Sequence, residues 1–428
     1  MARHEAAERQ GMSGQRMSKQ IPDRVVVVGS SVGGTRAAQG LRAAGFTGQV
    51  VIVGAEKVAP YDKPPLSKQL LSGEWSVEDI ALASVEELGG AGIELRLGVA
   101  AGGVDVANRT LTLVDGTTLG YDALVIATGV RPRTLSAPRT VALHTVRELA
   151  DVSALRGALD SGHGLVVVGG GFIGAEIAST AAGLGVPVSI VEALPAPFSR
   201  VLGDEVGGLL AQLHAENGVE VVSGTGVVAL RCGPTGLTEV ELGDGRVLSA
   251  GAVAVGIGCV PNTDWLAGSG IPLADGVATD QFSRVREVPG VYAIGDVANW
   301  HDVRTGTSRR VEHWTHAFQQ AQLVAHNIVH PDDLQAQTRA PYFWSDQHGV
   351  KIQMVGRRGR EDAVDVMWRD TSDGQRPVAL YSDRGRFTGG VTFGAPQLSA
   401  RLRRAWEDGL ALTDACALVA GLPAPARA

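Results

Sequence analysis

Residues 165–180 of the chain read LVVVGGGFIGAEIAST. The β-branched run before the glycines is typical of a buried parallel strand. Gly169, Gly171 and Gly174 complete the pattern G-x-G-x-x-G, in which the backbone turns tightly and a pyrophosphate can approach the N–H groups of the next helix. Glu192 ends the following apolar run, where a carboxylate can accept hydrogen bonds from a ribose. The segment therefore predicts a strand–turn–helix–strand unit that binds a dinucleotide.

A second unit of the same kind lies earlier in the chain. Residues 25–42 read VVVVGSSVGGTRAAQGLR, and Glu56 ends the next apolar run. Ser31 takes the middle glycine position between Gly29 and Gly34; its hydroxyl can donate to a phosphate, but its side chain crowds the approach. Two units in one chain predict two dinucleotides, held where electrons can pass between them.

The composition is that of an ordinary globular protein with two or three domains, at 428 residues, 44% hydrophobic and 19% charged. The net charge of −7 argues against a general nucleic-acid binder. No apolar run approaches the roughly 20 residues that a membrane span needs. Residues 1–20 are polar, lack the apolar core of a secretory signal, and are expected to form a disordered tail.

The three cysteines, Cys232, Cys259 and Cys416, are scattered along the sequence. They form no C-x-x-C pair and no metal-ligand cluster, so neither a disulfide framework nor a metal site is expected. A cytoplasmic location is the default for such a chain. The absence of a cysteine pair also removes the redox-active disulfide of thioredoxin-reductase-like and glutathione-reductase-like chemistry.

The rest of the chain alternates between strand-like and helix-like patterns. Strands are expected at 93–97, 104–106, 110–114, 121–128, 219–222, 226–242 and 251–256, and helices at 204–217 and 311–329. Residues 60–73, PYDKPPLSKQLLSG, are rich in proline and lysine and are expected to be irregular. After Pro341 alternating strands and a basic helix predict a separate, mostly β domain.

Several motifs in this order resemble those of the FAD-dependent NADH:ferredoxin reductases of bacterial oxygenase systems, which are putidaredoxin-reductase-like and biphenyl-dioxygenase-reductase-like flavoproteins. Besides the two glycine turns they are PYDKPPLSK (60–68), ATGVRPR (127–133), VYAIGDVAN (291–299), EHWTHA (312–317) and YFWSDQ (342–347). The resemblance runs from about residue 23 to about residue 400.

The resemblance implies a glutathione-reductase-like α/β fold with two Rossmann-like dinucleotide-binding domains and a small α+β C-terminal domain. After the tail at 1–20, the expected division is an FAD-binding domain at 21–136 and 259–338, an inserted NADH-binding domain at 137–258, and a C-terminal domain at 339–428. A hydride would pass from NADH to FAD. Electrons would leave singly to a small [2Fe–2S] or similar ferredoxin that feeds an oxygenase. The family contains both monomers and homodimers.

The resemblance also implies roles for particular residues around FAD. Gly29, Ser31, Gly33 and Gly34 would hold its pyrophosphate, Glu56 its adenosine ribose, and Gly295 and Asp296 its ribityl chain. Thr128, Gly129 and Arg131 would lie near the cofactor where the chain crosses between domains. Lys68 would lie against the flavin near N5, where a cation stabilises the reduced ring.

Around NADH, the glycines of the second turn would hold the pyrophosphate. Phe172, Ile173 and Gly258 are further candidate cofactor-binding residues. Glu176 would reach the nicotinamide end. Glu192 would bind the ribose 2′-hydroxyl and repel a 2′-phosphate, and no arginine or lysine follows it before Arg200, so NADH is expected over NADPH.

Glu312, His313, Trp314 and Trp344 would approach the flavin near the ferredoxin exit, and Lys68, Glu176 and Trp314 are the candidate catalytic residues. The family more often has asparagine where His316 stands. A basic docking patch for an acidic ferredoxin is expected at Arg309 and Arg310. Two other groups are candidates: Arg357, Arg358 and Arg360, and Arg401, Arg403 and Arg404.

Other functions remain open at this point. The electron acceptor could be a rubredoxin or another protein, and a flavin-binding interaction protein of the apoptosis-inducing-factor type shares the fold. NADH oxidases and coenzyme-A-disulfide or peroxide reductases need a redox cysteine near the flavin from the N-terminal part of the chain. No cysteine precedes Cys232, which argues against them.

Overall fold

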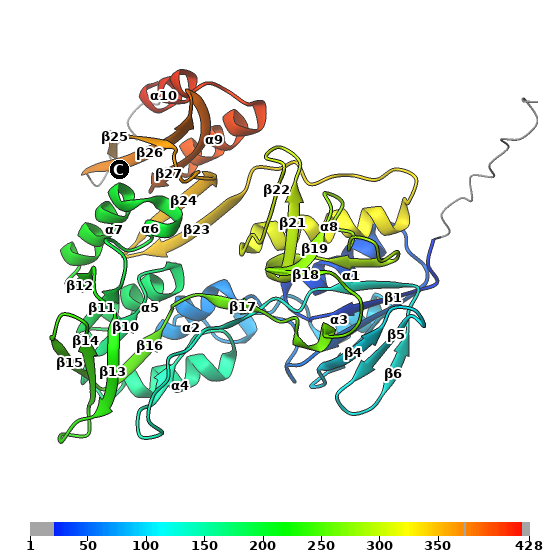
Figure 1. The fold of residues 1–428 in the computed structure, drawn as a ribbon, viewed down its shortest axis with the longest axis horizontal. Coiled ribbons are helices and arrows are strands. Elements are labelled where there is room, and N and C mark those ends of the chain that lie inside the picture. Colours follow the sequence, from blue (N-terminus) through cyan, green and yellow to red (C-terminus); the bar gives the residue numbers. More distant parts are fainter. Residues whose placement is uncertain (1–20, 372–373, 422–428) are drawn as a thin grey trace, which may run out of the picture.

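A computed structural model describes residues 21–371 and 374–421. The prediction of a disordered tail at 1–20 lies outside these residues. Figure 1 shows the sheet of the first glycine turn on one side of the molecule and the sheet of the second on the other, with the C-terminal sheet and helices above the second.

The first parallel sheet has the strand order β20-β7-β1-β2-β3. It comprises β1 (Arg24–Val28), β2 (Gln49–Gly54), β3 (Ile93–Leu97), β7 (Ala123–Ile126) and β20 (Val291–Ala293). Helices α1 (Val32–Ala43) and α8 (Trp314–Val329) pack on one face through a core of buried aliphatic residues. Because β20 follows the whole second unit in sequence, that unit is an insertion within the first.

The second parallel sheet has the order β12-β11-β10-β16-β9. Its strands are β9 (Leu143–His144), β10 (Leu165–Val168), β11 (Val188–Glu192), β12 (Glu220–Ser223) and β16 (Ala252–Val255). Helix α5 (Phe172–Gly183) follows the glycine turn, and α4 (Leu149–Leu159), α6 (Ser199–Leu202) and α7 (Asp204–Glu216) complete this part. The β-branched runs of both sheets are almost fully buried, which explains why they read as continuous apolar segments.

Two chain crossings join the two sheets. They pair with each other as the antiparallel strands β8 (Val130–Pro132) and β17 (Cys259–Pro261). Three smaller sheets flank the structure. They are β4 (Ala101–Asp105), β5 (Thr110–Leu113) and β6 (Thr118–Gly120); β13 (Val227–Cys232), β14 (Thr238–Leu242) and β15 (Val247–Ala250); and β18 (Leu273–Ala274), β19 (Gly276–Thr279), β21 (Ala298–Asp302) and β22 (Thr307–Arg309).

The C-terminal part is an antiparallel sheet of order β23-β24-β27-β26-β25. Its strands are β23 (Tyr342–Gln347), β24 (Val350–Gly356), β25 (Ala363–Thr371), β26 (Gly374–Asp383) and β27 (Arg386–Phe393), followed by α9 (Pro396–Asp408) and α10 (Leu412–Ala420). This confirms the predicted fold class of two Rossmann-like parallel sheets and a smaller C-terminal α+β unit. The exact domain boundaries stay a prediction.

Some local predictions were wrong. Residues 60–73 are not irregular throughout, because η1 (Pro64–Ser67) and α2 (Gln69–Ser72) form two short helical turns there. Proline at the start of η1 supplies a fixed φ and needs no N–H partner. Helix α8 begins at Trp314 rather than at 311, so Glu312 and His313 precede it, and His313 has an extended backbone. The remaining short elements are α3 (Val85–Gly90), η2 (Glu78–Ile80), η3 (Asp264–Leu266) and η4 (Gly295–Val297).

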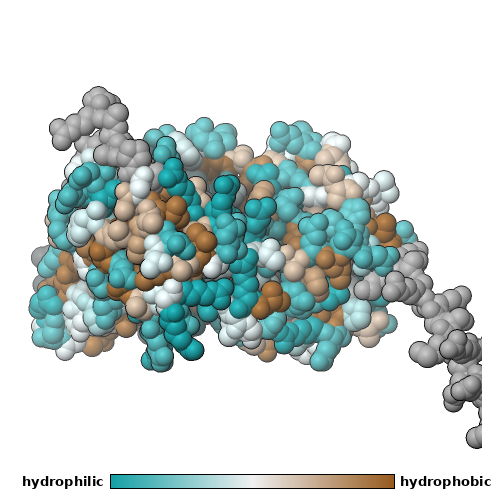
Figure 2. All heavy atoms as spheres, turned by 90° about the horizontal axis from the view of Figure 1, so that it is seen from above, coloured by the Kyte–Doolittle hydropathy of each residue, from teal (hydrophilic) through white to brown (hydrophobic). Residues whose placement is uncertain are grey.

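The face seen in Figure 2 mixes hydrophilic and hydrophobic residues throughout. Large hydrophobic side chains that are exposed come from separate parts of the fold, such as Val114 in the turn after β5, Val228 on β13 and Trp368 on β25. Among the described residues, no helix combines the length and the apolar character needed to cross a membrane.

Candidate functional site

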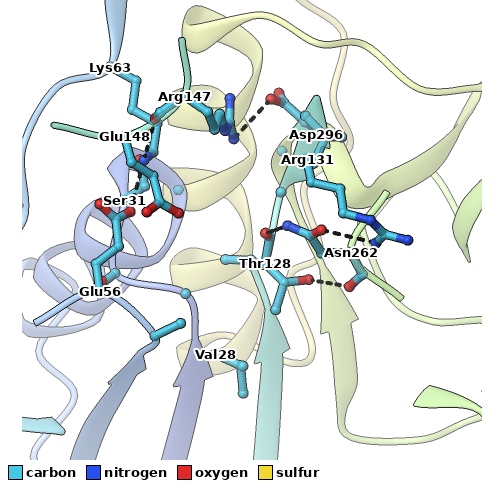
Figure 3. A pocket seen from close by; sticks show the side chains of 18 of the residues that line it. Val28, Ser31, Glu56, Lys63, Thr128, Arg131, Arg147, Glu148, Asn262 and Asp296 are labelled. Atoms are coloured by element: carbon cyan, nitrogen blue, oxygen red, sulfur yellow. Dashed lines mark hydrogen bonds and ion pairs between the residues drawn. The ribbon is translucent and has the colours of Figure 1, made fainter. Parts of the chain in front are cut away.

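A cavity of about 540 Å³ opens at the carboxyl ends of β1, β2 and β7. The first glycine turn, the end of β2 and the start of β8 line it, together with Asn262, Trp265 and residues 294–296. In Figure 3, Glu56, Lys63 and Glu148 lie on one side of this cavity, and Thr128, Arg131 and Asn262 lie on the other. Chain segments far apart in sequence therefore meet at one end of the first sheet, where parallel sheets usually bind their ligands.

The first glycine turn combines two structural glycines with an open position. Gly29 has φ +117°, and a Cβ on Gly34 would lie 1.8 Å from the carbonyl oxygen of Gly29, so neither tolerates a side chain. A Cβ on Gly33 would meet nothing closer than 3.7 Å, and this residue faces the cavity. Ser31 also lines the cavity, at the N-cap of α1, without making a capping hydrogen bond. The N-terminus of α1 is thus open toward a ligand.

Glu56 is held at the edge of the cavity by two neighbours that the sequence patterns did not indicate. Lys63 Nζ lies 2.9 Å from Glu56 Oε1, and the Tyr61 hydroxyl donates to Glu56 Oε2. Burial lowers the pKa of Lys63 and, together with the Glu56 carboxylate, raises that of Tyr61. Both partners lie in PYDKPPLSK, which was singled out only for Lys68.

On the opposite wall of the cavity, Asn262 is hydrogen-bonded to Thr128. Thr128 Oγ1 donates to the Asn262 carbonyl oxygen at 2.9 Å, and Asn262 Nδ2 donates to the Thr128 carbonyl oxygen at 2.9 Å. Arg131 reaches the rim, where its guanidinium lies 2.9 Å from the Asp264 carboxylate and is largely exposed. Gly129 has φ +63° and lines the cavity beside them. These pairs hold the two chain crossings together next to the cavity.

Asp296 lies at the end of the cavity near the N-terminus of α8. Burial raises the pKa of its carboxyl group, and the Arg147 guanidinium at 3.8 Å opposes that shift. The N–H of Gly295, whose φ is +69°, donates to Gln320 Oε1 at 2.8 Å. Sequence reasoning missed Arg147 because it comes from the connection at 137–163, which carries no motif.

The second glycine turn has the same construction. Gly169 has φ +101°, and a Cβ on Gly174 would lie 2.1 Å from the Gly169 carbonyl oxygen. A Cβ on Gly171 would meet only the Gly256 carbonyl oxygen, at 3.8 Å. Glu192 supports the turn, because its Oε2 accepts from the Gly170 N–H at 2.8 Å and its Oε1 from the Leu194 N–H at 2.8 Å.

The three further candidate cofactor-binding residues lie in different settings. Phe172 is half-buried against Phe343 of the C-terminal sheet, at 4.4 Å between ring centroids. Ile173 is exposed. Gly258, with φ +99°, lies on the chain crossing just before β17.

A buried ion pair connects the two dinucleotide units. Lys68 Nζ lies 2.7 Å from Glu176 Oε2, and the side chains are 10% and 4% exposed. The same oxygen accepts from Ser67 Oγ at 2.5 Å. Lys68 follows η1 on the first unit and Glu176 lies on α5 directly after the second glycine turn, so the structure brings these two candidate catalytic residues together.

Aromatic residues gather at the start of α8. Trp314 donates through Nε1 to Asp62 Oδ1 at 2.8 Å, and its ring centroid lies 6.2 Å from that of Trp344. Tyr342 stacks beyond Trp344, at 6.3 Å. His313 stacks on Phe343 at 4.5 Å, and burial lowers its pKa to about 4.

The prediction of an exposed docking patch at Arg309 and Arg310 was wrong. Arg309 pairs with the buried Asp302 at 3.3 Å. Arg310 is 10% exposed and pairs with Asp275 at 2.9 Å and with Glu312 at 2.5 Å. Both guanidinium groups are therefore engaged in ion pairs within the protein.

His316 is likewise internal, since it is 4% exposed and packs edge-on against Trp300. Burial lowers the pKa of its imidazole to about 3. The histidine at this position, where the family more often has asparagine, is therefore not a surface residue. It also carries no charge at neutral pH.

Comparison with known proteins agrees with this geometry. Residues 23–321 match the family described as "Pyridine nucleotide-disulphide oxidoreductase". The chain belongs to this family. Residues 342–419 match a second family, described as "Reductase C-terminal", which coincides with the antiparallel sheet and its two helices.

Curated relatives of this pyridine nucleotide-disulphide oxidoreductase include a rhodocoxin reductase from Rhodococcus erythropolis, 34% identical over 78% of each chain. Another is the ferredoxin–NAD(+) reductase component of the p-cumate 2,3-dioxygenase system from Pseudomonas putida, 36% identical over 78% of this chain and 81% of the relative. A solved covalent complex of putidaredoxin reductase with putidaredoxin superimposes with a TM-score of 0.86 at 28% identity, covering 94% of this chain and 99% of that one.

Despite the family's description, this oxidoreductase has no disulfide among its described residues, where all three cysteines are free. Cys232 is exposed on β13, and Cys416 lies on α10. Burial and the Glu312 carboxylate raise the pKa of Cys259 to about 12, so that this thiol stays protonated and unreactive at neutral pH.

Proposed function

We propose that this oxidoreductase passes electrons from NADH through FAD to a small [2Fe–2S] ferredoxin that feeds an oxygenase. The observation that carries the proposal is the buried Lys68–Glu176 pair, because it joins the two dinucleotide units at one point. A pair shared by both units is suited to a reaction in which the flavin and the nicotinamide meet. None of the three cysteines lines the first cavity, where the oxidase and disulfide-reductase alternatives would need a redox cysteine beside the flavin.

The first cavity fits FAD. Its volume of about 540 Å³, the open glycine position at Gly33 and the carboxylate of Glu56 suit a dinucleotide with its pyrophosphate at the N-terminus of α1. Asp296 would accept from the ribityl hydroxyls, with Arg147 beside it. FAD supplies the ability to take up two electrons together and release them singly. Lys68 would place its positive charge near the ring, and Glu176 would orient the nicotinamide.

The second glycine turn fits NADH. Gly171 leaves room for the pyrophosphate, and Glu192 stands at the end of β11, where a ribose would lie. Its two oxygens already accept from backbone N–H groups, so the carboxylate is held in place before the nucleotide arrives.

Replacing Glu192 by glutamine is expected to reduce the preference for NADH over NADPH about ten-fold, because a charge that repels the 2′-phosphate is removed. The substitution keeps the shape of the side chain and one acceptor oxygen. The measurement is kcat/KM for both nucleotides with an artificial dye as acceptor. An unchanged ratio would show that Glu192 supports only the turn.

The electron exit follows the aromatic residues at the start of α8. Trp314, Trp344 and Tyr342 form a continuous series of ring contacts, and Arg403 of α9 lies over the Tyr342 ring at 5.6 Å. The series therefore ends at α9, whose exposed residues include Arg401 and Arg404. We place the ferredoxin docking surface on this helix, the third of the arginine groups considered from the sequence.

The double variant Arg401→Glu/Arg404→Glu is expected to slow ferredoxin reduction about ten-fold at low salt and less at high salt, because exposed charges steer association and are screened by ions. Direct reduction of a dye by NADH should stay unchanged. The matched control is Arg231→Glu/Arg246→Glu, which reverses two exposed arginines, one on β13 and one in the turn between β14 and β15, in the distant β13–β15 sheet. Equal slowing in both double variants would contradict docking on α9.

The proposal is tested by the visible spectrum of the purified protein without oxygen, before and after one equivalent of NADH or NADPH. We expect a flavin band that NADH bleaches quickly and NADPH slowly. If the protein reconstituted with FAD is bleached by neither nucleotide, the proposed hydride transfer is wrong. We further propose a cytoplasmic location, which the three free cysteines favour.

A further inference from the structure

A chain of hydrogen bonds runs from a surface turn to the carboxylate of Glu176. Ser345 Oγ donates to Glu176 Oε1 at 2.7 Å, and Gln347 Nε2 donates to Ser345 Oγ at 2.9 Å. His214 Nε2 lies 3.1 Å from Gln347 Oε1. His348 Nε2 lies 2.9 Å from His214 Nδ1. Four side chains thus extend the Lys68–Glu176 pair away from the two glycine turns.

The carboxylate fixes the direction of every bond in this chain. A carboxylate only accepts, so the Ser345 hydroxyl donates and its oxygen is left to accept from the Gln347 amide N–H. The Gln347 carbonyl then faces His214, which must carry its proton on Nε2. His214 Nδ1 is left with a lone pair and accepts from His348. All donors therefore point toward Glu176, an arrangement in which each bond polarises the next.

The middle members of this hydrogen-bond chain are shielded from solvent. Ser345 and His214 are fully buried, and Gln347 is 1% exposed. Burial and the neighbouring His348 lower the pKa of His214 to about 4, and burial lowers that of His348. Both imidazoles are thus neutral at neutral pH, as the chain requires, because a protonated His214 would have no lone pair to accept with. Buried polar groups of this kind are costly unless every one is paired.

The hydrogen-bond chain also links the C-terminal sheet to two helices of the second dinucleotide unit. Ser345 and Gln347 lie on β23 of the C-terminal sheet, His214 on α7, and Glu176 on α5. Strand β23 packs against α5, as Figure 1 shows. His348 sits in the two-residue turn between β23 and β24 with φ +49°, and its N–H donates to Ser179 Oγ of α5 at 2.7 Å. The C-terminal sheet is thereby fastened to the helix that carries Glu176.

We propose that Ser345, Gln347 and His214 are positioning residues that hold the Glu176 carboxylate in the orientation needed for hydride transfer from NADH. None of the three contributes to a glycine turn, so they act through Glu176. The inference rests on the proposed function, because it assigns Glu176 to the nicotinamide end. It gives the C-terminal sheet a part in the reaction with NADH, in addition to its place beside the electron exit.

Ser345→Ala removes one of the three donors to Glu176. We expect the limiting rate of flavin reduction at saturating NADH to fall about ten-fold, with half-saturation by NADH changed by less than about two-fold. The matched control is Ser399→Ala in α9, an equally buried serine of the same sheet-and-helix unit whose hydroxyl has no hydrogen-bond partner among the described residues. The control should leave both quantities unchanged. Gln347→Glu keeps the shape of the side chain and removes its donor, so it should slow reduction even if Ser345→Ala folds poorly.

A second readout needs no NADH. The ¹⁵N spectrum of the histidine rings, with His214 assigned from His214→Gln, should show the Nε2–H tautomer in the wild type and in Ser399→Ala. In Ser345→Ala this preference should be lost, because the Glu176 carboxylate no longer sets the direction of the hydrogen bonds that Gln347 and His214 make. A wild type that NADH does not reduce would refute the proposed function, while the spectra would still show whether the chain is directional. Normal reduction by NADH in Ser345→Ala and Gln347→Glu would overturn the inference.

Discussion

Replacing Lys68 by methionine is expected to lower the free energy of unfolding by about 3–5 kcal/mol and to slow flavin reduction by NADH about 100-fold. The stability falls because the Glu176 carboxylate, 4% exposed, loses its cation and stays buried. The rate falls because the variant lacks the positive charge that we propose lies beside the flavin. The measurements are urea unfolding of the holoprotein and anaerobic stopped-flow reduction.

The double variant Lys68→Met/Glu176→Gln separates the two effects. Replacing both members of a buried ion pair by neutral groups of similar shape is often close to neutral for stability. The double variant should therefore regain most of the lost stability while the reduction stays slow. If Lys68→Met reduces at the normal rate, the lysine does not lie at the reacting ring and the pair is structural only.

The two glycine positions of the second turn should respond in opposite ways to alanine. Gly174→Ala places a Cβ 2.1 Å from the Gly169 carbonyl oxygen, so unfolding should become easier by more than about 3 kcal/mol. Gly171→Ala meets nothing closer than 3.8 Å within the protein, and its stability should change by less than about 1 kcal/mol. Its methyl group, however, would occupy the space in which we propose that the pyrophosphate lies. We therefore expect KM for NADH to rise at least about ten-fold.

Unfolding curves of the two alanine variants and steady-state kinetics with a dye acceptor check this pair. The same contrast exists in the first turn, where Gly34 is closed to a side chain and Gly33 is open. A Gly171→Ala variant with unchanged KM for NADH would mean that the pyrophosphate does not cross this residue.

The fold could be predicted because the sequence patterns that indicate it each lie within a short segment. Each glycine turn lies between two β-branched runs, so the sequence alone indicates a parallel strand, a turn and a helix. The insertion of the second unit was implied by the late position of VYAIGDVAN, and β20 lies beside β7 as that order requires.

Much of the site depends on long-range contacts that no local pattern reveals. Arg147 approaches Asp296 from a connection without a motif, and Asn262 is fastened to Thr128 across the two chain crossings. Arg309 and Arg310 read as a surface patch because two adjacent arginines are usually solvated. Their partners Asp302 and Asp275 precede them in sequence but meet them only when the four-stranded sheet β18-β19-β21-β22 has formed.

The central claim is tested most directly by mixing the protein with NADH and an excess of an oxidised [2Fe–2S] ferredoxin, such as putidaredoxin, without oxygen. The spectra of the flavin and of the iron–sulfur centre are followed together. The account predicts two ferredoxins reduced for each NADH oxidised, with the flavin reduced first. The experiment is repeated with several [2Fe–2S] ferredoxins from oxygenase systems. The account would be contradicted if NADH bleached the flavin while all of these ferredoxins stayed oxidised.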